Sequence, residues 1–188
     1  MKIVLDYGHG GSDPGATYKS RKESNDVLKL GQAVAKILKS AGVTVVETRS
    51  SDKTVSLQER TNISNNAKPD WFISIHRNAF KPEQASGAEV FVFTTSNIKE
   101  KAFAASLQQA LVSIGYRNRG VKLGNYHVLR ETKAQSILLE VGFIDTSNDN
   151  KIFDERFNDI AAALATTILK ARGIKLVKRV CTACGQPV

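Results

Sequence analysis

The chain has 188 residues, which is long enough for one domain with a core of its own. Its hydrophobic content of 41% and charged content of 24% are ordinary for a globular protein, and no apolar run approaches the roughly 18 residues of a membrane-spanning helix. The net charge of +9 favours a polyanionic partner, although solubility alone would also account for it. Because the basic residues are scattered and no known nucleic-acid-binding motif is present, we expect neither nucleic-acid binding nor membrane insertion.

The two ends of the chain differ from its middle. The N-terminus leads directly into an apolar run, so we expect no secretory signal peptide. Both cysteines, Cys181 and Cys184, lie at the C-terminal end, and without a second Cys-x-x-Cys pair we do not expect them to hold zinc. We predict one folded domain over residues 1–172, followed by a linker or a stub of a C-terminal module over residues 173–188.

Apolar runs and amphipathic periodicity alternate along the chain. In chain order they predict a strand at 3–5, a helix at 25–40, a strand at 43–47, a helix at 56–67, strands at 71–75 and 88–93, a helix at 98–114, a loop at 116–123, a short edge strand at 126–129, a strand at 137–141 and a helix at 154–172. This order indicates an α/β fold. We expect a single three-layer domain in which a twisted, mostly parallel or mixed sheet of about six strands is flanked by helices.

A glycine-rich loop follows the first predicted strand. Four glycines and Pro14 fall within eight residues, and His9 stands among them. In open α/β sheets, ligands and catalytic groups gather just beyond the carboxyl ends of the strands, where His9 lies. A phosphate-binding loop is an alternative, but neither GxGxxG nor GxxxxGK(S/T) is present. We expect the glycines to fold the chain back, so that Glu23 beyond the loop meets His9.

Two histidines and one glutamate are the candidate metal ligands. His76 follows the strand predicted at 71–75, as His9 follows the first strand, and Glu23 lies between them. Two imidazoles and a carboxylate make the His2Glu set of a catalytic zinc, which leaves the fourth position for a water whose pKa falls toward about 7. Glu140 lies in an apolar run, where a carboxylate is costly unless it is paired or near a metal, and this position suits a general base.

Each of these residues also has a simpler interpretation when taken alone. A histidine after a strand is more often a cap or a solvent-exposed residue than a ligand. Glu23 is favoured at a helix N-terminus by the macrodipole, and Glu140 could be the buried partner of an ion pair. The joint arrangement of the four residues is what favours a zinc centre.

Several groups of residues recur in a known family, and they are spread in order over residues 2–172. The first groups are Leu5-Asp6-Tyr7-Gly8-His9-Gly10-Gly11 with Asp13-Pro14-Gly15-Ala16 and Glu23, then Thr48-Arg49, Asp52, Val55-Ser56-Leu57 and Arg60. The later groups are Ser74-Ile75-His76-Arg77-Asn78-Ala79, Gly87-Ala88-Glu89-Val90, Val128-Leu129-Arg130 and Leu138-Leu139-Glu140-Val141-Gly142-Phe143-Ile144. Together they resemble the zinc-dependent N-acetylmuramoyl-L-alanine amidases of the amidase_3 type.

The resemblance implies hydrolysis of the amide bond between N-acetylmuramic acid and the L-alanine of the peptidoglycan stem peptide. The family's zinc ligands fall on His9, Glu23 and His76, and its catalytic glutamate falls on Glu140. Glu140 would take a proton from the attacking water and hand it to the leaving alanine amine. Peptidoglycan is thus the expected partner, with anionic wall polymers as a second one, and the oligomeric state stays open.

The chain departs from the family pattern at several positions. Tyr7 and Gln135 stand where proline is common. Arg77 replaces a small residue and is expected to reach a carboxylate of the stem peptide or the wall, whereas His127 is expected to be a core or surface histidine rather than a catalytic one. The segment 79–88 is too short for the autoinhibitory helix of some secreted members, which predicts a site that is open without an activator.

Without a visible signal peptide, the chain looks like a phage endolysin or a sporulation-lysis enzyme. Such a protein is made in the cytoplasm and reaches the wall after release through a holin, or after lysis of the host or mother cell. Two other functions stay open: a non-catalytic wall-binding module with a structural zinc, and a zinc peptidase that cuts within the stem peptide.

Overall fold

The structure, a computed structural model, describes residues 1–171. The predicted linker or stub at 173–188, with Cys181 and Cys184, lies outside the described residues. Among the described residues, no helix combines the length and the apolar character that a membrane span requires.

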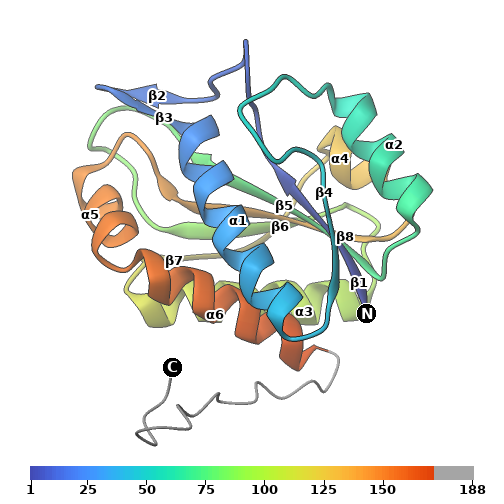
Figure 1. The fold of residues 1–188 in the computed structure, drawn as a ribbon. Coiled ribbons are helices and arrows are strands. Elements are labelled where there is room, and N and C mark those ends of the chain that lie inside the picture. The colour runs from blue at the N-terminus through green and yellow to red at the C-terminus, as the bar shows by residue number, and fades with distance from the viewer. Residues whose placement is uncertain (172–188) are drawn as a thin grey trace, which may run out of the picture.

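A six-stranded sheet forms the middle layer, and its strand order is β4-β1-β5-β8-β6-β7 (Figure 1). Its strands are β1 (Lys2–Tyr7), β4 (Thr44–Glu47), β5 (Trp71–Asn78), β6 (Ala88–Val92), β7 (Asn118–Leu123) and β8 (Gln135–Phe143). Neighbouring strands are parallel except β6 and β8, which are antiparallel. A separate hairpin consists of β2 (Thr17–Tyr18) and β3 (Arg21–Lys22). The predicted α/β fold with a mixed sheet is confirmed.

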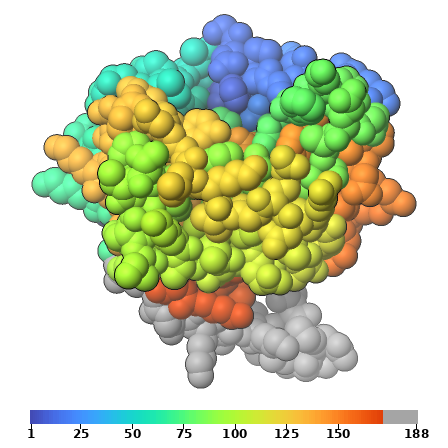
Figure 2. Space-filling model, turned by 180° about the vertical axis from the view of Figure 1, so that it is seen from behind, coloured from blue at the N-terminus to red at the C-terminus, as the bar shows by residue number. Residues whose placement is uncertain are grey.

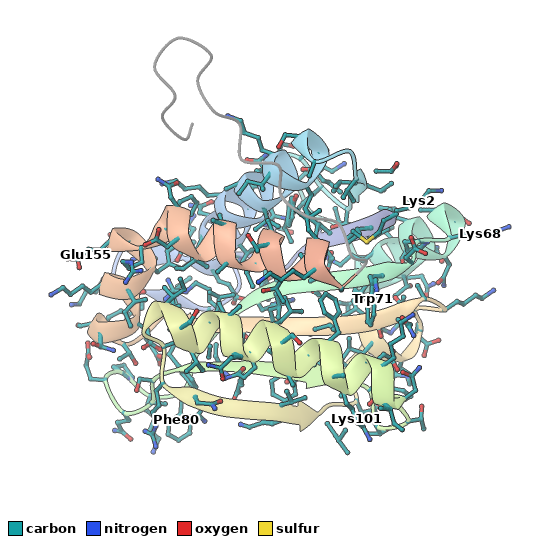
Figure 3. All side chains as sticks on the ribbon, turned by 90° about the horizontal axis from the view of Figure 1, so that it is seen from below. Lys2, Lys68, Trp71, Phe80, Lys101 and Glu155 are labelled. Carbon is teal, nitrogen blue, oxygen red and sulfur yellow. The ribbon has the colours of Figure 1, made fainter. Side chains whose placement is uncertain are left out.

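Helices cover both faces of the sheet, which makes three layers (Figures 1 and 3). One face carries α1 (Glu23–Ser40), α3 (Ile98–Ile114), α5 (Ser147–Glu155) and α6 (Phe157–Lys170), and the other carries α2 (Leu57–Ala67) and the four-residue α4 (His127–Arg130). The larger apolar core lies under α1, α3 and α6, and Figure 3 shows α3 and α6 side by side over the strands. The smaller core under α4 leaves room on that side for a cavity next to the strand ends.

The boundaries of the first three long helices follow signals in the sequence. α2 begins with a capping box, in which the Ser56 side chain accepts from the Glu59 N–H while the Glu59 carboxylate accepts from the Ser56 N–H. Asn97 and Glu100 form the same arrangement at the start of α3. α1 ends before Gly42, whose φ of 79° is a conformation that suits glycine. The helices predicted before residue 115 are therefore confirmed.

Two predictions for the C-terminal half were wrong, and one helix was missed. Residues 116–123, predicted as a loop, contain β7, an edge strand whose charged side chains suit an edge position. Residues 126–129, predicted as a strand, lie in and around α4, where two adjacent apolar side chains are buried together, contrary to the alternation of a strand. The helix predicted at 154–172 corresponds to α6, whereas α5, which ends at Glu155 and is separated from α6 at Arg156 with φ −112° and ψ 21°, was not predicted.

Candidate active site

The candidate residues converge at one edge of the sheet because three neighbouring strands are parallel. His9 follows β1, His76 lies near the end of β5, and Glu140 lies on β8. His76 and Glu140 are register partners across β5 and β8, so their side chains lie side by side on one face of the sheet. Glu23 is the first residue of α1.

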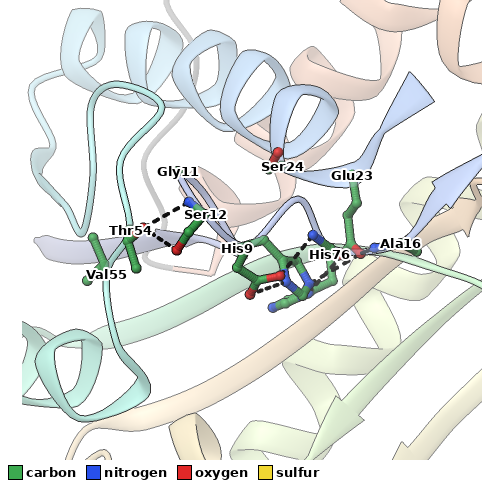
Figure 4. A network of polar contacts seen from close by, with 12 residues as sticks. His9, Gly11, Ser12, Ala16, Glu23, Ser24, Thr54, Val55 and His76 are labelled. Atoms are coloured by element: carbon green, nitrogen blue, oxygen red, sulfur yellow. Dashed lines mark hydrogen bonds and ion pairs between the residues drawn. The ribbon is translucent and has the colours of Figure 1, made fainter. Parts of the chain in front are cut away.

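His9, Glu23 and His76 form a compact group of possible metal ligands. One ligand atom from each residue lies within 4.8 Å of the others. The Glu23 carboxylate bridges the two imidazoles, with Oε2 at 3.2 Å from His9 Nε2 and Oε1 at 2.9 Å from His76 Nδ1 (Figure 4). The three residues predicted as metal ligands are therefore brought together by the fold.

Two glycines of the loop make this closeness sterically feasible. A Cβ atom at Gly8 would lie 2.3 Å from the His76 ring. A Cβ atom at Gly15 would lie 2.6 Å from the His9 ring and 2.7 Å from Glu23 Oε2. Gly15 also has a φ of 66°, which L side chains rarely adopt. The glycines thus let the chain fold back so that Glu23 meets His9, as the sequence predicts.

Further contacts orient the three candidate ligands. Asp13 Oδ2 lies 2.8 Å from His9 Nδ1, which leaves Nε2 of His9 for Glu23 or a metal ion. The Glu23 carboxylate accepts from the backbone N–H of Ala16 at 2.9 Å and of Arg77 at 3.0 Å. A carboxylate that holds a metal-binding histidine in place is a usual feature of metal centres. The residues around the three candidate ligands therefore also fit a metal site.

The charges of this group suit a cation. Burial alone would raise the pKa of Glu23, but hydrogen bonds from His76 and His9 outweigh burial and hold that pKa well below its usual range. Burial alone would lower the pKa of His9, but Glu23 and Asp13 raise it to about 9. Glu23 likewise raises the pKa of His76 against the effect of burial. A divalent cation would displace these protons, because it binds neutral imidazole and ionised carboxylate.

Two buried arginines hold the loop that carries His9. Nη2 of Arg49 donates to the carbonyl of Gly8 at 2.9 Å and to that of Ser24 at 2.7 Å, which are the neighbours of His9 and Glu23 in the sequence. Nη2 of Arg60 donates to the carbonyl of His9 at 2.7 Å. Both arginines belong to the motif quoted for the family resemblance, but nothing in the sequence showed that their partners would be backbone carbonyls of this loop.

Glu140 lies beside this group and takes part in no ion pair within the described part of the chain. Its Oε2 atom is buried and has no hydrogen-bond partner among the described residues. Burial raises the pKa of the Glu140 carboxyl to about 8, against the effect of His76 and with a further contribution from the Glu23 and Glu89 charges. The alternative of a buried ion-pair partner is therefore disfavoured, and one carboxylate oxygen is available to a substrate or water.

A cavity of about 490 Å³ opens at this place. Its polar end contains His9, His76 and Glu140. Its apolar walls come from α2, α4, β8 and the segments before the two helices, and they consist of Val55, Leu57, Tyr126, Val128 and Leu138. Leu57 and Tyr126 are exposed at 56% and 39%, so this rim is accessible to a large substrate.

Two residues that depart from the family pattern can now be placed. Arg77 is buried, forms an ion pair with Asp26 at 2.6 Å and donates to the carbonyls of Val141 and Phe143 at 3.2 Å. The expectation that Arg77 reaches a substrate carboxylate was wrong, because its guanidinium points into the protein. His127 lies at the cavity wall at the start of α4.

The segment between β5 and β6 contains turns and bends and no helix. This agrees with the prediction that residues 79–88 leave no room for an inserted helix.

Comparisons with known proteins agree with this geometry. The model of the N-acetylmuramoyl-L-alanine amidase family matches residues 3–170. The sporulation-specific N-acetylmuramoyl-L-alanine amidase of Bacillus subtilis (strain 168) is 37% identical over 161 residues, which cover 84% of this chain and 62% of that protein. The probable cell wall amidase LytH of Staphylococcus epidermidis (strain ATCC 12228 / FDA PCI 1200) is 39% identical over 160 residues, 83% of this chain and 52% of that protein.

A solved structure resembles the fold over almost its whole length. The catalytic domain of CwlV, an N-acetylmuramoyl-L-alanine amidase from Bacillus (Paenibacillus) polymyxa var. colistinus, matches with a TM-score of 0.85 and 33% identity. The match covers 93% of this chain and 99% of that domain. By contrast, the chain spans only 62% and 52% of the length of the two relatives above.

Proposed function

Because the chain belongs to the N-acetylmuramoyl-L-alanine amidase family, we propose that it hydrolyses the amide bond between N-acetylmuramic acid and the L-alanine of peptidoglycan, with zinc as its metal. The observation that carries the proposal is the placement of Glu140 beside His76, next to three ligand atoms that lie within 4.8 Å of one another. The cavity with its exposed apolar rim provides access for a glycan–peptide substrate.

The donor set fits zinc. Two imidazoles and one carboxylate are a usual protein ligand set for catalytic zinc, and the Asp13 carboxylate at Nδ1 of His9 orients the ring so that Nε2 faces the ion. His9, Glu23 and His76 would hold the ion. When bound, zinc supplies Lewis-acid chemistry: it polarises the amide carbonyl and lowers the pKa of an adjacent water toward about 7.

Glu140 carries the proton transfers. It accepts a proton from the attacking water as the water oxygen bonds to the amide carbonyl carbon. It then returns that proton to the alanine nitrogen as the carbon–nitrogen bond breaks, so the carboxylate is regenerated. Its unpartnered Oε2 and its position beside His76 suit both steps.

A digest of purified peptidoglycan tests the reaction. The zinc-loaded protein should release stem peptides that begin with L-alanine and carry no sugar, as seen by mass spectrometry. Fragments cut within the stem peptide would identify a peptidase instead. Sedimentation with the wall but no new amine groups would identify a binding module.

Two substitutions test the roles of the residues. Glu140→Gln should keep its zinc and lose activity by roughly 100-fold or more, which is the usual contribution of general acid–base catalysis. A zinc-loaded Glu140→Gln protein with near-wild-type turnover would rule out the general-base role. His9→Ala should lose both zinc and activity, and a metal-replete, active His9→Ala protein would contradict its role as a ligand.

A further inference from the structure

Two cations on the edge strand β7 share one carboxylate. Glu89 on β6 is buried, with 4% of its surface exposed. Its Oε2 atom lies 2.9 Å from Nε of Arg119 and also forms an ion pair with Nζ of Lys122. Its other oxygen accepts from Nδ2 of Asn78 at 2.5 Å. Glu89 thus holds both cations in place.

The cluster of Glu89, Arg119 and Lys122 continues a row of side chains that begins at the candidate metal site. His76 pairs in register with Glu140 across β5 and β8, and Glu140 pairs with Glu89 across β8 and β6. Register partners project from the same face of a sheet, with Cβ atoms about 5 Å apart. The order along the row is therefore His76, Glu140, Glu89 and then the two cations. In Figure 2, β7 (yellow) is exposed at the surface between residues 79–87 (green) and the segment around α4 (gold).

The cluster has one positive charge in excess and donors to spare. The side chains of Arg119 and Lys122 are 28% and 41% exposed, whereas that of Glu89 is 5% exposed. Nη1 of Arg119 has only a long contact of 3.5 Å with the Ser86 carbonyl, and its Nη2 has no hydrogen-bond partner among the described residues. Its guanidinium also lies over the Phe143 ring, 4.8 Å from the centroid, which fixes the orientation of the group. These features describe a preformed site for an anion.

We propose that Arg119 and Lys122 bind a carboxylate on the peptide side of the scissile amide. This proposal rests on the proposed function, because that function sets the direction of the substrate. The carbonyl of the amide faces the metal ligands, and its nitrogen faces Glu140, which protonates it. The peptide beyond that nitrogen therefore continues away from His76, toward the two cations.

The distances favour the α-carboxylate of the second peptide residue as the group that Arg119 and Lys122 bind. Two strand spacings of about 4.8 Å separate β8 from β7, and two residues of extended peptide span roughly 7 Å. The long side chains of Arg119 and Lys122 cover the remainder. A stem peptide whose second residue has a free α-carboxylate would thus reach this anion subsite, and the glycan would lie on the opposite side of the metal.

The test compares two synthetic muramoyl tripeptides that differ only at the second residue, where the α-carboxylate is free in one and amidated in the other. With zinc-loaded protein, kcat/KM should be at least about tenfold higher for the free carboxylate. Lys122→Gln and Arg119→Gln should bring this ratio toward one, because each variant should lower kcat/KM more for the free-carboxylate substrate than for the amidated substrate. Lys122→Arg, which keeps the charge, should preserve the preference.

Lys36→Gln is the matched control, because Lys36 is an exposed residue of α1 and its loss changes the net charge by the same amount. It should leave the ratio as in the wild type. Equal kcat/KM for the two substrates, or an equal loss on both in the Lys122 and Arg119 variants, would overturn the anion subsite. Failure to cleave either substrate at the muramoyl–alanine bond would instead contradict the proposed function.

Discussion

Gly15→Ala should weaken metal binding much more than it weakens the fold. The added Cβ atom would lie 2.6 Å from the His9 ring and 2.7 Å from Glu23 Oε2, whereas ordinary contacts begin at 3.4 Å. The two side chains must therefore separate from it by roughly 0.8 Å. Zinc–ligand distances tolerate only about 0.2 Å, so we expect zinc affinity to fall at least about tenfold.

Gly42→Ala is the matched control for this prediction. Gly42 also has a positive φ, 79° against 66° at Gly15, but a Cβ atom there meets nothing within 4 Å. Each variant should lose about 1–2 kcal/mol of unfolding free energy from the left-handed backbone, measured by denaturant titration of the metal-free protein. Zinc affinity is measured by competition with a chromophoric chelator. If Gly15→Ala binds zinc as tightly as Gly42→Ala does, the contact does not set the ligand geometry.

Three more outcomes follow from the buried groups around the site. Arg49→Lys should lose about 2–4 kcal/mol of unfolding free energy, because one ammonium cannot satisfy the carbonyls that the planar guanidinium joins; an unchanged denaturation midpoint would contradict this. Gly31→Ala places a Cβ atom 2.0 Å from the Tyr7 ring, so denaturation should show a loss of about 1–3 kcal/mol with unchanged zinc affinity. Burial opposes the charge of Asp6, but Arg60 and two hydroxyl groups outweigh it and lower its pKa. Asp6 therefore adds stability above about pH 4, and this stability is lost as the pH falls through the folded-state pKa of Asp6. The unfolding free energy of Asp6→Asn, measured by denaturant titration at several pH values, should lack this part of the decrease at low pH.

The sequence by itself determined the main elements and the four residues of the candidate site. The first three long helices and the central strands have strong local periodicity, which depends only on neighbouring residues. His9 and His76 follow apolar runs, so the common edge of parallel strands was enough to bring them together. Glu23 and Glu140 were found because an acid after a glycine loop or within an apolar run is unusual.

Only the tertiary structure decided which polar side chains face the substrate and which face the protein. Arg77 pairs with Asp26, 51 positions away, and Glu89 pairs with Arg119 and Lys122, 30 and 33 positions away. The edge strand β7 and the short α4 were likewise set by packing against distant strands, with little local signal. Such contacts depend on strand order and register, and a periodic pattern in one segment carries no information about its neighbours in space.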